Sequence, residues 1–237
     1  VFVLDDEIQH VEAWAPFYHE PLVHLAAGFV RKVRQVLILG GGTLFAAAEA
    51  LKYRSVKQVV LVDHDPEVTK TVARHYPHAR RCLKDSRLHL VGQDAYESEI
   101  RGAQEFDLVI NDGLDLLNVR ASQSGKDAFE RLTALAGPRG ICSDVVQRHV
   151  FETTRIRRTI DRLRRRSRLA LSLVTVPEYH GVLHLLSVWG AAGSNVAQTL
   201  TRPINLEQRR WAKDRATCPC TYYDPRFLCY YLYLPPY

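Results

Sequence analysis

The stretch that decides the fold is ILGGGTLFAAAEALKY, residues 38–53. A hydrophobic strand runs into three glycines and then into an alanine-rich helix, which is how several α/β folds bring backbone N–H groups close to a ligand. Phe45 stands where a dinucleotide-binding loop of the pattern GxGxxG has its third glycine. The loop therefore predicts a nucleotide-type ligand but argues against NAD.

Strands and helices alternate on both sides of this loop. The expected strands read as continuous apolar runs over 35–40, 58–63, 88–94, 106–112 and 140–146, with a last pair over 170–177 and 182–190. Expected helices cover about 18–29, 43–53, 66–76, 127–136 and 154–169, after a β-like lead over 1–14. This alternation predicts an α/β, doubly wound, mostly parallel sheet of the Rossmann-like type that is covered on both faces.

Composition limits the classes of function. The chain has 237 residues and a net charge of +6, but much of that charge lies in the helix expected over 154–169, whose arginines we assign to a solvated face. Nucleic acid is therefore not an expected partner. Because no apolar run approaches the roughly 20 residues of a membrane span and no secretory signal is visible, we expect a cytoplasmic protein without membrane contact.

Cysteine and histidine are scattered along the chain. The five cysteines form no CxxC pair, and the closest histidines, His75 and His78, have no second ligand pair at metal spacing. This pattern predicts reduced thiols and no metal. The sequence also contains no methionine, and our hypothesis is a truncated start with modified methionines omitted.

Acidic residues follow several of the expected strands. The glycines Gly40, Gly41 and Gly42 follow the first strand, and the strand ends carry Asp63, Asp94, Asp112 and Asp115. Since the carboxyl ends of parallel strands meet at one edge, these groups predict a site for a cationic or hydroxyl-rich ligand. The alternative is that each aspartate only caps the following helix. A nucleoside with a phosphate-free tail, such as S-adenosylmethionine with its sulfonium cation, fits this pattern best.

Six segments, in chain order, carry a family resemblance. They are LDDEIQHVEAWAPFYHE (4–20), VLILGGG (36–42), LVDHDPEV (61–68), FDLVINDGLD (106–115), VPEYHG (176–181) and CTYYDPRFLCYYLYLPPY (220–237). Together they resemble the polyamine aminopropyltransferases, the family of spermidine synthase. The resemblance implies that residues 1–17 are the remnant of an N-terminal β region and that residues 18–237 form a Rossmann-like catalytic domain. It also implies a homodimer.

The resemblance further implies an activity and a set of roles. The family transfers an aminopropyl group from decarboxylated S-adenosylmethionine to a small di- or polyamine such as putrescine. Asp112 would be the base, Asp115 would hold the same amine, and Tyr18 with Tyr179 would orient the acceptor. The residues implied for the donor are Asp63 at the ribose, Asp94 and Ala95 at the adenine, the three loop glycines, Thr43, Gln9 and His19.

Thr43 departs from the family, which has an aspartate after the glycine triplet to grip the donor's ammonium group. The loss of such a charge-assisted hydrogen bond is worth roughly 1.5 to 3 kcal/mol. Two alternatives to aminopropyl transfer therefore stay open. One is methyl or aminocarboxypropyl transfer from intact S-adenosylmethionine, and the other is a non-catalytic nucleoside-binding protein. The sequence does not name the amine.

Overall fold

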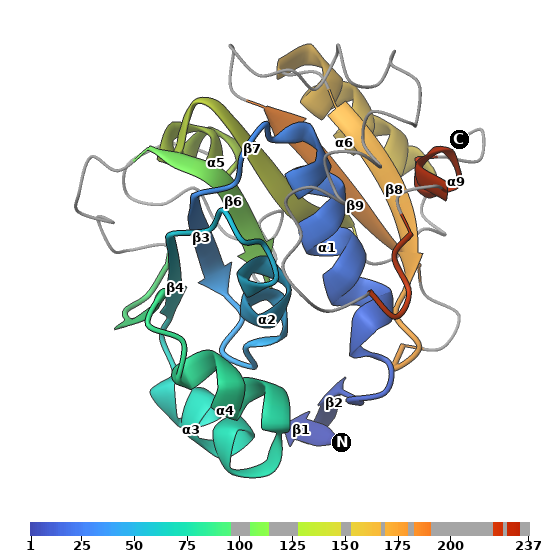
Figure 1. Ribbon diagram of the computed structural model, residues 1–237. Helices are drawn as coiled ribbons and strands as arrows, with labels where there is room; N and C mark the ends of the chain where they lie inside the picture. The colour runs from blue at the N-terminus through green and yellow to red at the C-terminus, as the bar shows by residue number, and fades with distance from the viewer. Residues whose placement is uncertain are drawn as a thin grey trace.

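The computed structural model describes residues 1–95, 105–113, 128–147, 153–166, 169–179, 183–190, 220–224 and 227–232 (Figure 1). Its strands are β1 (Phe2–Leu4), β2 (Glu7–His10), β3 (Gln35–Gly40), β4 (Gln58–Asp63), β5 (Leu88–Gly92), β6 (Phe106–Asp112), β7 (Ala136–Gln147), β8 (Leu169–Thr175) and β9 (Leu183–Gly190). Its helices are α1 (Ala15–Phe29), α2 (Phe45–Leu51), α3 (Pro66–His75), α4 (Pro77–Leu83), α5 (Ala128–Leu135), α6 (Thr153–Arg166) and α9 (Leu228–Tyr231).

Seven strands form one sheet in the order β5-β4-β3-β6-β7-β9-β8. The strands β5, β4, β3, β6 and β7 are parallel to one another, whereas β9 is antiparallel to both β7 and β8. The chain leaves β3 toward β4 and β5 and then returns to the other side of β3 as β6. The switch point of the sheet therefore lies between β3 and β6, where α/β folds bind ligands.

The central strands of the sheet are buried on both faces, as their continuous apolar runs predict, whereas the edge strand β5 is partly exposed. Along β3, Val36 and Ile38 point into a core shared with α1 and α2, while Leu37 and Leu39 point into a smaller core that includes Leu132 of α5. Figure 1 shows α1 and α2 on one side of the sheet. The expectation of a doubly wound, mostly parallel α/β sheet is confirmed.

Some element boundaries differ from the expected ones. Helix α1 begins at Ala15 rather than near Tyr18, because Pro16 falls in the first turn, where its missing N–H group is tolerated. Helix α4 was not expected, and Pro77 begins it in the same way. In α6, Ile160 is buried as predicted, and Arg157 and Arg164 are exposed. None of the described helices combines the length and apolar character needed to cross a membrane.

The first ten residues form a separate two-stranded sheet. β1 and β2 pair as an antiparallel hairpin, and residues 5 and 6 in its turn both have positive φ. The hairpin lies beside the carboxyl end of the main sheet near α3 and α4 (Figure 1). The β-like lead expected at the N-terminus is thus a hairpin that is placed to cover the glycine loop.

Candidate functional site

The site begins where β3 and β6 end side by side. Gly40, the last residue of β3, pairs in register with Asp112, the last residue of β6. Asp63 ends β4 on the other side of β3. The sheet topology therefore brings Asp63 and Asp112 to the two sides of the glycine loop at the switch point.

The loop comes unusually close to both carboxylates. A β-carbon at position 41 would lie 2.7 Å from Oδ2 of Asp112, and one at position 42 would lie 2.9 Å from Oδ2 of Asp63. Gly41 also has a φ of +76°, which disfavours other residues. Leu44 has a φ of 65° as well, and its side chain is fully buried. Leu44, the residue that precedes α2, is thus held in a left-handed conformation while its side chain is packed in the core.

Asp63 fixes the shape of the loop. Its Oδ2 accepts a hydrogen bond from the N–H of Gly42 at 2.8 Å, and its Oδ1 accepts one from the N–H of Asp65 at 2.9 Å. A carboxylate has about four lone-pair sites, so Asp63 can still accept hydrogen bonds from a ligand. His78 supports the other side of the loop, with Nε2 2.9 Å from the carbonyl oxygen of Thr43.

Asp112 has the properties of a general base. Its side chain is 5% exposed, and burial, reinforced by the charge of Asp63, raises the pKa of Asp112 to about 7. A hydrogen bond from the Tyr18 hydroxyl acts against this rise by lowering the pKa. A carboxylate whose pKa lies near neutral pH is a much stronger proton acceptor than an ordinary aspartate.

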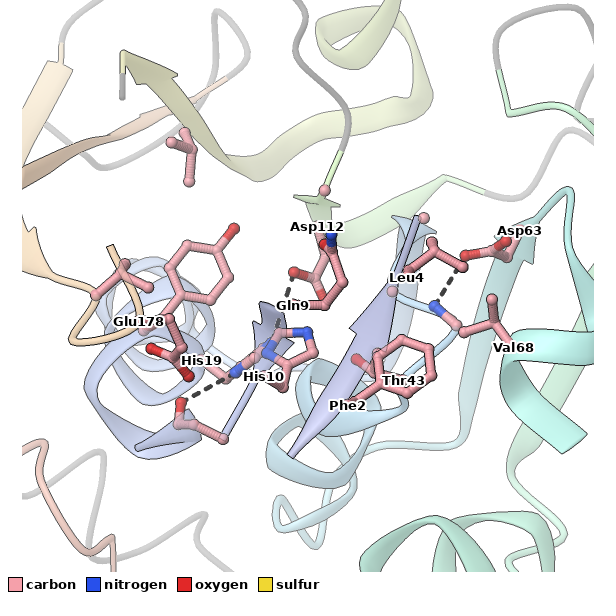
Figure 2. A pocket seen from close by; sticks show the side chains of 18 of the residues that line it. Phe2, Leu4, Gln9, His10, His19, Thr43, Asp63, Val68, Asp112 and Glu178 are labelled. Carbon is pink, nitrogen blue, oxygen red and sulfur yellow. Dashed lines mark hydrogen bonds and ion pairs between the residues drawn. The ribbon is translucent and has the colours of Figure 1, made fainter. Parts of the chain in front are cut away.

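A cavity of about 410 Å³ opens in front of these groups (Figure 2). The expected site residues that line it are Gln9, Tyr18, His19, Gly40, Gly41, Gly42, Thr43, Asp63, Asp112 and Tyr179. Asp94 is exposed and Ala95 is buried after β5, and neither is among the described residues that line the cavity. Asp115 lies outside the described residues.

The cavity is lined by acids although the chain is basic overall. Asp5, Asp63, Asp65, Asp112 and Glu178 all contribute to its wall, and no lysine or arginine of the described residues does. Two histidines of the wall, His10 and His19, do not reverse this sign, since burial lowers the pKa of His10 to about 2 and that of His19 to about 4. Such a cavity is suited to a cationic ligand, which the clustering of strand-end aspartates predicted.

Glu178, His184 and His10 are among the wall residues that were not expected. Glu178 accepts a hydrogen bond from the N–H of Val11 at 2.9 Å and so connects the end of the hairpin to the loop after β8. The ring of His184 lies 5.7 Å from that of Tyr179 and 6.2 Å from that of Tyr18. His10 packs on His19, with 5.0 Å between the ring centroids. The position of Glu178 beside Tyr179 was a usable signal, but nothing in the sequence singled out the two histidines.

Among the described residues, three side chains of the kinds that bind metal ions lie close together outside the cavity wall. The ligand atoms of His24, Glu49 and Cys220 lie within 4.8 Å of one another. Lys52 already pairs with Glu49, with 2.5 Å between the charged atoms, and Nε2 of His24 lies 2.8 Å from Glu49. The group therefore reads as a satisfied polar network that joins α1 to α2.

Comparisons with known proteins agree with the geometry. Residues 15–198 match the sequence model of the Spermine/spermidine synthase domain. A polyamine aminopropyltransferase of Pyrobaculum calidifontis is 35% identical over 135 residues, which cover 55% of this chain and 46% of that protein. One of Hydrogenobaculum sp. is 26% identical over 221 residues, which cover 90% of this chain and 76% of that protein.

A different activity also occurs among the relatives. Putrescine N-methyltransferase 2 of Nicotiana attenuata is 33% identical over 132 residues, which cover 55% of this chain and 34% of that protein. Two of these three relatives are thus matched over less than half of their own length. The crystal structure of spermidine synthase from Thermotoga maritima has the same fold, with a TM-score of 0.78 at 19% identity, covering 99% of this chain and 77% of that one. From the family match, the chain belongs to the spermine/spermidine synthase family.

Proposed function

We propose that this protein is an aminopropyltransferase. It moves the aminopropyl group of decarboxylated S-adenosylmethionine to a small di- or polyamine and releases methylthioadenosine. The observation that carries the proposal is Asp112, a buried carboxylate with a pKa near 7 that faces an acid-lined cavity at the switch point. Family membership and the aminopropyltransferase relatives support the same activity.

The acceptor amine must lose a proton before it can react. Its pKa is near 10, as for lysine, so transfer to a group of pKa about 7 is uphill by about 4 kcal/mol, and transfer to an ordinary aspartate by about twice that. Asp112 takes the proton, and the nitrogen lone pair attacks the carbon next to the sulfonium. The carbon–sulfur bond breaks with its electron pair going to sulfur, which leaves as a neutral thioether.

The cavity wall provides the remaining roles. Tyr18 and Tyr179 line it on the acceptor side and orient the amine, and Asp115 is assigned to the same amine by the family pattern. The donor lies along the glycine loop, with its ribose hydroxyls on Asp63 and its tail toward Gln9 and Thr43. Asp94 and Ala95, which follow β5 beyond the described cavity wall, are assigned to the adenine by the family pattern.

The choice of donor is the point at which a second function is tested. Thr43 supplies a hydroxyl where an aspartate would exclude a carboxylate, and one relative is a putrescine N-methyltransferase. The family model nevertheless favours aminopropyl transfer over methyl or aminocarboxypropyl transfer.

The assay incubates the protein with putrescine and each donor in turn. Methylthioadenosine from the decarboxylated donor supports the proposal, and S-adenosylhomocysteine from the intact donor identifies a methyltransferase. Methylthioadenosine from the intact donor alone identifies aminocarboxypropyl transfer.

Assembly and location belong to the same proposal. A homodimer is supported by apolar side chains exposed on the N-terminal hairpin, of which Val1 is 74%, Val3 51% and Ile8 45% exposed. Light scattering after gel filtration measures the mass of the assembly.

We also assign the protein to the cytoplasm, where polyamine substrates and reduced thiols are both expected. Fractionation of cells tests this assignment.

A further inference from the structure

Two buried polar atoms face each other across the floor of the cavity. Nε2 of His19 lies 3.7 Å from Oδ1 of Asp112, and the two side chains are 2% and 5% exposed. Figure 2 shows them converging from α1 and from the end of β6. Nε2 of His19 has no hydrogen-bond partner among the described residues, nor has Oδ2 of Asp112. Buried polar atoms are ordinarily hydrogen-bonded, so the lack of partners for Nε2 of His19 and Oδ2 of Asp112 requires an explanation.

The tautomer of His19 follows from its other nitrogen. Nδ1 lies 3.0 Å from the carbonyl oxygen of Ala15, and a carbonyl oxygen can only accept, so Nδ1 carries the hydrogen. Burial lowers the pKa of His19 to about 4, so the ring is neutral at neutral pH. Nε2 of His19 is therefore a bare lone pair that can only accept a hydrogen bond.

An ionised Asp112 also offers only acceptors toward His19. Two acceptors with no hydrogen between them cannot bond, and a separation of 3.7 Å is longer than a hydrogen bond. A proton on Asp112 changes the relationship, because the O–H of a carboxylic acid can donate to Nε2. Catalytic hydrogen bonds are often long before substrate binds and shorten in the reacting complex.

We propose that His19 is a positioning residue that accepts a hydrogen bond from Asp112 after Asp112 has taken the proton of the acceptor amine. The inference rests on the proposed function for the identity of that amine. The proton leaves the ammonium nitrogen, binds to an oxygen of Asp112 and stays there, and His19 remains neutral. With its hydrogen directed at Nε2, the acid is turned away from the amine while the nitrogen attacks. This places His19 with the base rather than on the donor side.

Other groups act on the pair but cannot replace this contact. Asp63 on β4 raises the pKa of Asp112, and the Tyr18 hydroxyl lowers it. The pKa of His19 is raised by the charge of Glu49 on α2 and lowered by His78 on α4. His10 on β2 packs against the ring of His19. The hydrogen bond from Tyr18 favours the ionised form of Asp112, whereas acceptance by Nε2 of His19 favours the protonated form. Loss of Nε2 should therefore lower the pKa of Asp112, and loss of the Tyr18 hydroxyl should raise it.

The first test measures protonation directly and needs no turnover. In wild-type protein, ¹⁵N spectra at pH 7.5 should show His19 neutral with hydrogen on Nδ1, and hydrogen on Nε2 overturns the inference. The pKa of Asp112 is measured from the pH dependence of its carboxyl ¹³C signal, which is assigned with Asp112→Asn. This pKa should be lower by about half a unit in His19→Leu, the size of a net hydrogen bond. If no hydrogen bond to His19 exists, the leucine only makes the surroundings of Asp112 more apolar, which raises the pKa of Asp112. An unchanged or raised pKa of Asp112 in His19→Leu therefore overturns the inference. His10→Leu is the matched control and should not lower the midpoint.

The second test uses turnover. The acid limb of the pH profile of kcat/KM should move to lower pH in His19→Leu by the same amount, with the KM for the donor unchanged. A raised donor KM with an unmoved acid limb identifies a donor-side residue and contradicts the proposal. If the wild-type protein consumes neither donor, the proposed function fails, and the two spectroscopic titrations still decide the protonation of the pair.

Discussion

Gly41 lies directly against Asp112, so that a β-carbon added at position 41 would be 2.7 Å from Oδ2 of the carboxylate. Gly41→Ala should therefore displace Asp112 and strain a backbone with φ of +76°. We expect a loss of about 100-fold in kcat/KM, the usual effect of moving a catalytic group by about 1 Å. The control is Gly92→Ala, where nothing lies within 4 Å of the added carbon. Equal activities of the two variants would show that Asp112 is not held by this contact.

Thr43 makes a prediction about donor choice. It lines the cavity and is 8% exposed, so Thr43→Asp would add a partly desolvated carboxylate to the wall. We expect this variant to bind decarboxylated S-adenosylmethionine about 10-fold more tightly, through a charge-assisted hydrogen bond, and to bind the intact donor more weakly. Calorimetry with each donor measures both effects, and Thr43→Asn is the uncharged control. A uniform loss of affinity for both donors would place the donor's tail elsewhere.

The fold could be predicted from the sequence more completely than the site. The apolar strands 35–40, 58–63 and 106–112 and the glycine loop determine the doubly wound sheet, because both signals are local. The position of Asp63 and Asp112 at one edge of the sheet could also be predicted, since the carboxyl ends of parallel strands meet there. The sequence could not place His10 or His184 at the cavity, because their positions depend on how the hairpin and β9 pack. Asp94 follows a strand as predicted, but β5 is the edge strand, farther from the switch point.

His19 predicts a stability that depends on pH. Burial lowers the pKa of His19 from 6.5 to about 4, so the folded state resists the proton that the unfolded chain accepts. Its contribution is fully present above pH 6.5 and is lost as the pH falls toward 4. Relative to His19→Gln, which does not titrate, the wild-type free energy of unfolding should fall by about 2 to 3 kcal/mol between pH 7.5 and pH 4. Urea unfolding across this range measures the difference. A free-energy difference between the two proteins that stays constant across this range would mean that His19 has the same pKa in the folded and unfolded states, and would contradict the prediction.

Glu20 should anchor the segment that follows residue 220. Its carboxylate is 1% exposed and accepts hydrogen bonds from the backbone N–H groups of Thr221, Tyr222 and Tyr223, each at 2.7 Å. In Glu20→Gln an amide nitrogen cannot accept, and we expect a loss of about 2 to 3 kcal/mol in the free energy of unfolding. Urea unfolding measures this, and proteolysis should cut near residue 221 sooner. Glu67→Gln, at an exposed ion pair with Lys70, is the control and should change stability by less than about 1 kcal/mol.

The central claim is that Asp112 takes a proton from an amine that then displaces a sulfonium sulfur. The most direct measurement is the rate of methylthioadenosine formation by Asp112→Asn from putrescine and decarboxylated S-adenosylmethionine, beside its affinity for methylthioadenosine. The account predicts that turnover falls by at least about 100-fold, the lower range for a lost general base, while nucleoside affinity stays within about twofold. Formation of methylthioadenosine at the wild-type rate in this variant would contradict it.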